Sequence, residues 1–249
     1  MSEKIFLAGA TGVIGSVLVK LLVNAGYTVY GSTRREDRAE SLRSLGAIPI
    51  IVDVFNVDGL KSELVQIKPT YVVHQLTDLP RGLDPSQMAK AIARNAKLRN
   101  EGTANLVEAT QSSGCTRIVA QSIAWAYAAG SKPYIEEDAL DLQAEGLRRI
   151  SVSGIAALER NILDTPSMNG TVLRYGHLYG PGTGTDQASG ASPLHVEAAA
   201  FAALLAVQLD VSGVYNIAED NSEVCSEKAK RVLEWSASLR LASRNLDSQ

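Results

Sequence analysis

A glycine-rich stretch near the amino terminus constrains the fold more than any other part of the sequence. It is Gly9-Ala10-Thr11-Gly12-Val13-Ile14-Gly15, and it follows the short apolar run Lys4–Ala8. After it, apolar residues recur at the spacing of one helix face until Gly26, a residue type that commonly follows a helix end. The stretch therefore predicts a buried strand, a tight turn and an amphipathic helix.

The turn between this strand and this helix has the features of an anion site. Unpaired N–H groups at a helix N-terminus and the helix dipole attract a pyrophosphate, and side chains at the three glycines would block its approach. A turn before a helix also uses glycine without any ligand, but the strand, the spacing and the helix together favour dinucleotide binding. The residues predicted to bind it here are Gly9, Thr11, Gly12, Val13, Ile14 and Gly15.

Strand-like and helix-like patterns alternate along the 249 residues. The alternation predicts an α/β fold, a Rossmann-like doubly wound parallel sheet with helices on both faces. The length suits one hydrophobic core. We expect residues 1–175 to form the dinucleotide-binding Rossmann domain and residues 176–249 to form a small substrate-binding portion packed on the same core.

Charge and composition exclude several classes of function. The formal net charge is −3, with both signs spread along the chain, so no basic footprint for nucleic acid is present. The early strand leaves no room for a signal peptide and no apolar run approaches the roughly 18 residues that span a bilayer, so we expect a cytoplasmic protein without a membrane partner. Neither the two cysteines nor the three histidines have metal-ligand spacing, and no metal site is predicted.

The end of the second expected strand, Thr28–Ser32, bears on the choice of cofactor. An NAD site places a carboxylate there for the ribose 2′-hydroxyl, whereas this chain continues with Thr33, Arg34 and Arg35. A guanidinium fork suits a 2′-phosphate in shape and charge. The pattern therefore favours NADP over NAD, with the alternative that both arginines are solvated loop charges.

Two motifs resemble those of the extended and atypical short-chain dehydrogenase/reductases, the group that includes the NAD-dependent epimerase/dehydratases. The glycine stretch has the spacing Gly-Ala-Thr-Gly-x-x-Gly, and the run Asn100–Ala109 is similar to the signature N-x-x-G-T-x-N-L-x-E-A. The resemblance implies that Asn100 orients strand ends near the nicotinamide. It also implies a homodimer.

The resemblance places two further pairs of residues at the cofactor. Asp53 and Val54 match the end of the third strand, where the family has an Asp near the adenine amino group. Gln75 and Leu76 stand at the end of the fourth strand, beside the cofactor phosphates and ribose, although the family usually has small residues there. Asp53 is also suited to capping a turn without any ligand.

The catalytic residues of the family are only partly present. Ser122 ends the fifth expected strand, where the family has the serine or threonine that binds the substrate oxygen; a plain turn residue is the alternative. The family's Tyr-x-x-x-Lys pair is missing, because no tyrosine in the chain is followed four residues later by lysine. Alignment on Glu159 puts Ser151 in place of the tyrosine and Ile155 in place of the lysine.

Two residues are candidates to replace the missing proton donor. Tyr127 follows Ser122 on the next loop, and His177 follows the sixth expected strand in a segment that resembles the nicotinamide-side loop of the family. The ordinary pKa of histidine, near 6.5, suits proton transfer at neutral pH. The alternatives are that Tyr127 packs against Trp125 and that His177 only lines the loop.

Three hypotheses follow. The first is an NADP-dependent oxidoreductase of the atypical short-chain type that acts on a carbonyl or hydroxyl group of a small organic molecule. The second is a sugar-nucleotide epimerase or dehydratase, which the missing tyrosine and lysine disfavour. The third is a non-catalytic NADP-binding sensor or regulatory protein. Such a protein would have intact cofactor motifs and no catalytic pair, as this sequence does.

Overall fold

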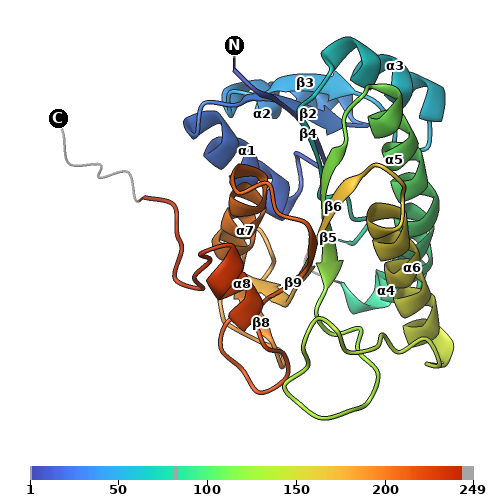
Figure 1. The fold of residues 1–249 in the computed structure, drawn as a ribbon, viewed down its shortest axis with the longest axis vertical. Helices are drawn as coiled ribbons and strands as arrows, with labels where there is room; N and C mark the ends of the chain where they lie inside the picture. Colours follow the sequence, from blue (N-terminus) through green and yellow to red (C-terminus); the bar gives the residue numbers. More distant parts are fainter. Residues whose placement is uncertain (1, 81–83, 243–249) are drawn as a thin grey trace.

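A computed structural model describes residues 2–80 and 84–242. Its centre is a parallel sheet with the strand order β3-β2-β1-β4-β5-β6-β9 (Figure 1). The order reverses next to β1, which is the pattern of a doubly wound fold, so the fold class expected from the sequence is confirmed. The strands are β1 Lys4–Ala8, β2 Thr28–Thr33, β3 Ile48–Ile51, β4 Tyr71–His74, β5 Arg117–Ile123, β6 Asn169–Tyr175 and β9 Gly213–Ile217.

Helices cover both faces of the sheet (Figure 1). Helices α1 and α7 pack on one face around a large apolar cluster, and α3, α5 and α6 pack on the other around a second cluster. The helices are α1 Val13–Asn24, α2 Ala39–Ser44, α3 Val57–Ile67, α4 Pro85–Lys97, α5 Thr103–Ser112, α6 Gly146–Leu163, α7 Val196–Gln208 and α8 Glu227–Val232, with a 3₁₀ turn η1 at Glu36–Arg38.

Local sequence accounts for the edges and ends of these elements. Pro49 lacks an N–H donor and lies in β3, which is the edge strand of the sheet. The fourth strand is shorter than its apolar pattern suggests, because the Leu76 N–H donates to Nδ1 of His74, 3.2 Å away, rather than to a neighbouring strand. Strand β4 therefore ends at His74, and Gln75 begins the loop at the carboxyl edge of the sheet.

The helix between Pro85 and Ser112 is not continuous. A π-helical turn, η3 at Leu98–Gly102, joins α4 to α5. Such turns hold one residue more than an α-helical turn and occur often at functional sites. The turn decides which residues of this long helix face the sheet.

The last part of the chain shares the core of the first part. Strand β9 pairs with β6, and α7 packs against α1. A small parallel pair, β7 at His177–Tyr179 and β8 at Pro193–His195, lies outside the main sheet. The assignment of residues 176–249 to substrate binding stays a prediction. Within the described residues, no helix is long and apolar enough to cross a membrane.

Candidate active site

The glycine turn forms a cradle at the start of α1. Gly12 is the N-cap, no side chain caps the helix, and the Gly12 N–H donates to the Gly9 carbonyl at 3.0 Å. Gly9 has φ +85°, and a Cβ there would lie 2.6 Å from the backbone carbonyl atoms of Gln75. A Cβ on Gly15 would overlap the Gly9 carbonyl. The free helix N-terminus and the missing side chains leave room for an anion close to the backbone.

A groove opens beside this turn, between the ends of β1, β2 and β4. One wall holds Gln75, whose Oε1 is fully enclosed and has no hydrogen-bond partner among the described residues. An enclosed acceptor of this kind calls for a donor from a ligand or a water. Of the residues predicted to bind the cofactor, those lining the groove are Gly9, Thr11, Gly12, Arg34, Arg35, Asp53, Val54, Gln75 and Leu76.

The two arginines after β2 differ in their surroundings. The Arg34 side chain is 60% exposed and its nearest ion-pair partner is Asp78, at 3.8 Å. The Arg35 Nε donates to Asp37 at 3.0 Å, and this hydrogen bond lowers the pKa of Asp37. Arg34 is therefore the arginine whose charge is less neutralised by a neighbour.

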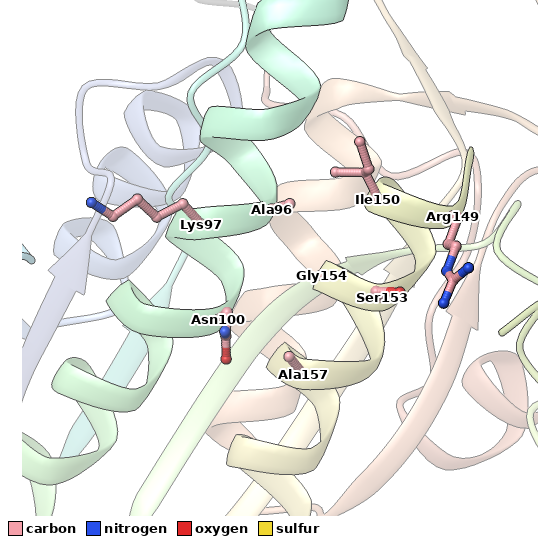
Figure 2. Close-up of a pocket in the computed structure, with 8 residues that line it drawn as sticks. All are labelled: Ala96, Lys97, Asn100, Arg149, Ile150, Ser153, Gly154 and Ala157. Carbon is pink, nitrogen blue, oxygen red and sulfur yellow. The ribbon is translucent and has the colours of Figure 1, made fainter. Parts of the chain in front are cut away.

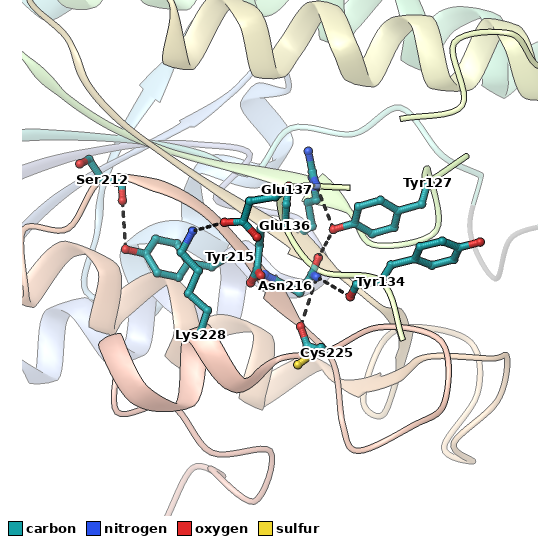
Figure 3. Close-up of polar contacts among 10 residues, drawn as sticks. Tyr127, Tyr134, Glu136, Glu137, Ser212, Tyr215, Asn216, Cys225 and Lys228 are labelled. Carbon is teal, nitrogen blue, oxygen red and sulfur yellow. Dashed lines mark hydrogen bonds and ion pairs between the residues drawn. The ribbon is translucent and has the colours of Figure 1, made fainter. Parts of the chain in front are cut away.

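Ser122 and Tyr127 belong to one buried polar network. The Ser122 hydroxyl donates to Oε1 of Glu159 at 2.7 Å, and Glu159 accepts two further bonds from Arg174, at 2.9 and 2.7 Å. The Tyr127 hydroxyl accepts a bond from Arg174 at 2.8 Å and donates to Asn216 at 2.6 Å (Figure 3). Burial raises the pKa of Tyr127, against the opposing effect of the Arg174 charge. Both hydroxyls are thus engaged within the protein.

His177 lies outside this network. Its ring stacks on Trp125 with 6.0 Å between ring centroids, and Trp125 is 40% exposed. Partial burial lowers the pKa of His177, so the imidazole is mostly neutral at pH 7. The structure therefore joins Ser122 and Tyr127 in one hydrogen-bond network that does not include His177; the catalytic roles of all three stay predictions.

The comparisons with known proteins agree with this geometry. Residues 5–213 match the model of the NAD dependent epimerase/dehydratase family. The chain belongs to that family. It is 36% identical over 239 residues to a 3-diazoavenalumate denitrifying reductase of a Streptomyces species, an alignment that covers 87% of this chain and 76% of the reductase.

Solved structures show the same fold at low sequence identity. UDP-glucose 4-epimerase of Thermotoga maritima, solved with UDP-glucose, has a TM-score of 0.77 at 18% identity, with 95% of this chain and 94% of that chain covered. Gre2 of Candida albicans, solved in complex with NADPH, has a TM-score of 0.76 at 15% identity, with 94% of each chain covered. At these identities the likeness concerns the fold alone.

The family signature around Gly102 has a different register from the one expected. The Asn100 side chain is exposed and lines a groove between α4 and α6 (Figure 2). This groove shares no lining residue with the groove beside the glycine turn. The signature has two positions between its Asn and its Gly, so its Asn stands three residues before the Gly; in this chain Arg99, not Asn100, stands three residues before Gly102. Arg99 is buried, so it is the residue that sequence reasoning missed; counting back from Gly102 would have found it.

Helix α6 carries the residues that stand in place of the family's tyrosine and lysine. Ser151 is 7% exposed and Ile155 is fully buried. An isoleucine side chain offers no hydrogen bond or charge to a ribose or a phenol. Among the described residues no group of histidines, cysteines and carboxylates is arranged to hold a metal ion.

A buried histidine at the end of β4 makes the stability of the protein depend on pH. Burial, assisted by the Arg99 charge, lowers the pKa of His74 to about 4. Since the unfolded value is near 6.5, unfolding takes up a proton between these values, and stability is lost as the pH falls from 6.5 towards 4. We expect His74 to account for about 3 kcal/mol of that loss.

The measurement is urea unfolding at pH 7 and pH 4 for the wild type and for His74→Gln. Glutamine does not titrate, and it retains a donor towards the Thr103 hydroxyl, which lies 3.0 Å from Nε2 of His74. The loss of stability between the two pH values should be smaller in the variant. Equal losses in both proteins would mean that His74 titrates normally in the folded state.

Proposed function

We propose that the protein is an NADP-dependent reductase that transfers hydride to a small organic molecule. The observation that carries this proposal is the groove itself, in which a glycine cradle and two arginines occur together without a carboxylate at the end of β2. Strand β2 ends at Thr33, whose hydroxyl accepts a hydrogen bond from the Arg35 N–H. That arrangement suits a phosphate on the ribose better than a free 2′-hydroxyl.

The chain's own residues would hold the cofactor in defined roles. The N–H groups at the start of α1 would bind the pyrophosphate, and Arg34 would bind the 2′-phosphate. The enclosed Gln75 Oε1 would accept a hydrogen bond from a hydroxyl or amide of the cofactor. When bound, NADPH supplies the hydride.

The two arginines give a direct test of the nucleotide preference. Arg34→Ala is expected to weaken NADPH binding about 10- to 100-fold, because it removes a charge-assisted bond to the phosphate, and to leave NADH binding nearly unchanged. Arg35→Ala should weaken it less, because Asp37 already neutralises Arg35. Fluorescence titration with both nucleotides measures this. The exposed Arg43 on α2 is the control, and an equal loss for NADPH and NADH would contradict the assignment of Arg34.

The absence of the tyrosine and lysine on α6 limits the kinds of compound that could accept the hydride. Reduction of a carbonyl needs a proton for the oxygen, and Tyr127 and His177 are the proposed donors, with Ser122 binding the oxygen. Of the two donors, only His177 has a side chain outside the Arg174 network. A carbonyl substrate would therefore depend on His177 more than on Tyr127.

A second acceptor requires no proton donor and is favoured by a specific observation. The Streptomyces relative is named for the denitrifying reduction of a diazo compound. When a diazonium group accepts hydride, the carbon–nitrogen bond breaks, dinitrogen leaves, and a carbon–hydrogen bond takes its place while NADPH becomes NADP⁺. No oxygen is protonated, so Ile155 in place of lysine would be no obstacle to this reaction.

The experiment is to follow NADPH oxidation with an arenediazonium salt and a panel of aldehydes and ketones, and to incubate the NADP⁺-loaded protein with UDP-glucose. Arene and dinitrogen, or an alcohol, formed in equal amounts with NADP⁺ would support a reductase of the corresponding kind. Epimerised sugar without net reduction of NADP⁺ would indicate an epimerase instead. Tight NADPH binding without turnover of any compound would favour the sensor. Reactions without protein control for direct reduction of the diazonium salt.

A further inference from the structure

Arg99 is a buried cation that has no counter-charge among the residues described by the structure. It lies in the π-helical turn η3 and is 8% exposed. Among the described residues no carboxylate pairs with it, and burial alone lowers the pKa of Arg99 to about 10. A buried guanidinium without a partner costs several kcal/mol, and structures retain one mainly where something else compensates for it.

The nearest titratable neighbour provides no such compensation. His74 and Arg99 are close enough for the Arg99 charge to act on the imidazole. Nδ1 of His74 accepts a hydrogen bond from the Leu76 N–H, so Nε2 carries the proton and donates to the Thr103 hydroxyl. Both ring nitrogens are engaged, and neither is free to accept a bond from Arg99.

The position of Arg99 connects it to the candidate site. His74 is the last residue of β4, so Arg99 lies at the carboxyl end of the sheet, where α/β folds bind their ligands. Its neighbour Leu98 lines the cofactor groove, and η3 packs against α6, which carries Ile155. Arg99 retains a small contact with solvent, since the residue is 8% exposed.

The phosphates of a dinucleotide have other partners. The pyrophosphate would lie at the N-terminus of α1 and the 2′-phosphate at Arg34, and Arg99 is not part of the groove that contains both. The nicotinamide ring of NADP⁺ is itself cationic and would not compensate a guanidinium. The ligand of Arg99 is therefore a separate anion.

We propose that Arg99 binds a carboxylate of the substrate, so that the reductase acts on small organic acids. The proposal rests on the proposed function, since it places this acid beside the bound cofactor. A guanidinium presents two parallel N–H groups to the two oxygens of a carboxylate, a geometry that a lysine cannot provide.

The test measures the binding of acetate, benzoate and cinnamate to the NADP⁺-loaded protein by thermal shift and by quenching of tryptophan fluorescence. Methyl benzoate and methyl cinnamate are the uncharged counterparts. The relevant acids are those that the wild type binds more tightly than their esters. Arg99→Met is expected to weaken the binding of these acids about 10- to 100-fold and to leave ester binding unchanged. Arg149→Met, at an exposed arginine of α6, is the matched control.

The same variant gives a second readout that a structural arginine would not give. If Arg99 has no counter-charge, Arg99→Met should raise the Tm of the ligand-free protein by about 2–4 °C while it abolishes carboxylate binding. The proposal would be overturned if the Tm of Arg99→Met were lower than that of Arg149→Met. It would also be overturned if the wild type bound each acid no more tightly than Arg99→Met does.

Arg99→Lys keeps the charge and removes the fork, and it tests the proposal if the methionine variant does not fold. Acid binding should fall about tenfold with ester binding unchanged, and unchanged acid binding would overturn the proposal. These readouts do not require turnover. If carboxylate binding depends on Arg99 but no NADPH is oxidised, the reductase proposal is refuted and the anion site is not. If NADPH is oxidised and this activity does not depend on Arg99, the anion site is refuted and the reductase proposal is not.

Discussion

Gly9→Ala is expected to weaken NADPH binding at least about 100-fold, equivalent to about 2.7 kcal/mol. The new Cβ would lie 2.6 Å from the backbone of Gln75, so either the glycine turn or the end of β4 must move. Both border the groove that we propose for the cofactor, in which the turn would hold the pyrophosphate. The strain of φ +85° adds to the collision, and we expect the free energy of unfolding to fall by about 2–4 kcal/mol.

Gly26→Ala separates the effect of strain from that of collision. Gly26 has nearly the same φ, +89°, and a Cβ there meets nothing within 4 Å. Its substitution should cost about 1–2 kcal/mol of stability and leave NADPH binding unchanged. Urea unfolding and fluorescence titration of both variants make the comparison. NADPH binding by Gly9→Ala within twofold of the wild type would show that the cofactor does not bind at this turn.

Glu159→Ala is expected to lower the free energy of unfolding by about 3–5 kcal/mol. The side chains of Glu159 and Arg174 are only 7% and 5% exposed. The two hydrogen bonds between them hold together the buried polar network that contains Ser122 and Tyr127. Burial lowers the pKa of Arg174, but the hydrogen bonds that Arg174 donates to Glu159 and the charge of that carboxylate raise this pKa above its ordinary value. Without Glu159 the guanidinium stays charged and buried, and Ser122 loses its acceptor.

The double variant Glu159→Leu, Arg174→Met tests whether the cost comes from the charge left behind. It should be more stable than either single variant, since apolar residues of similar size need no counter-charge. A double-mutant cycle in urea measures the coupling between the two positions. The exposed pair Arg43 and Glu40 is the control and should contribute less than about 1 kcal/mol. A loss below 1 kcal/mol for Glu159→Ala would mean that water replaces the carboxylate.

The parts of the molecule that depend on local backbone chemistry could be predicted from the sequence. The glycine turn is one such part, because positive φ at Gly9 and close approach at Gly15 leave few other residue types. The alternation of strands and helices was sufficient for the sheet, and the arginines after the second strand do lie in the groove. Each of these features follows from residues that are neighbours in the chain.

The polar network could not be predicted in the same way. Tyr127 and Asn216 are 89 residues apart. Tyr127 follows β5, which pairs with β6, and β6 pairs with the β9 strand that holds Asn216, in registers that no local pattern specifies. The position of Ser122 at a strand end was foreseen, but its bond to Glu159 depends on how α6 packs against β5. The sequence thus predicted these two hydroxyls but not their hydrogen-bond partners. The partners decide whether a hydroxyl is available to bind a substrate or to donate a proton.

The π-helical turn has a consequence for any alignment of this chain with its relatives. It adds one residue to the helix that runs from Pro85 to Ser112. Deleting one residue there would rotate α4 by about 100° relative to α5. Oδ1 of Asn95 would then lose the hydrogen bond that it now accepts from the Asp78 N–H. In a relative with an unbroken helix, the inward-facing side chains of α4 therefore occupy positions shifted by one.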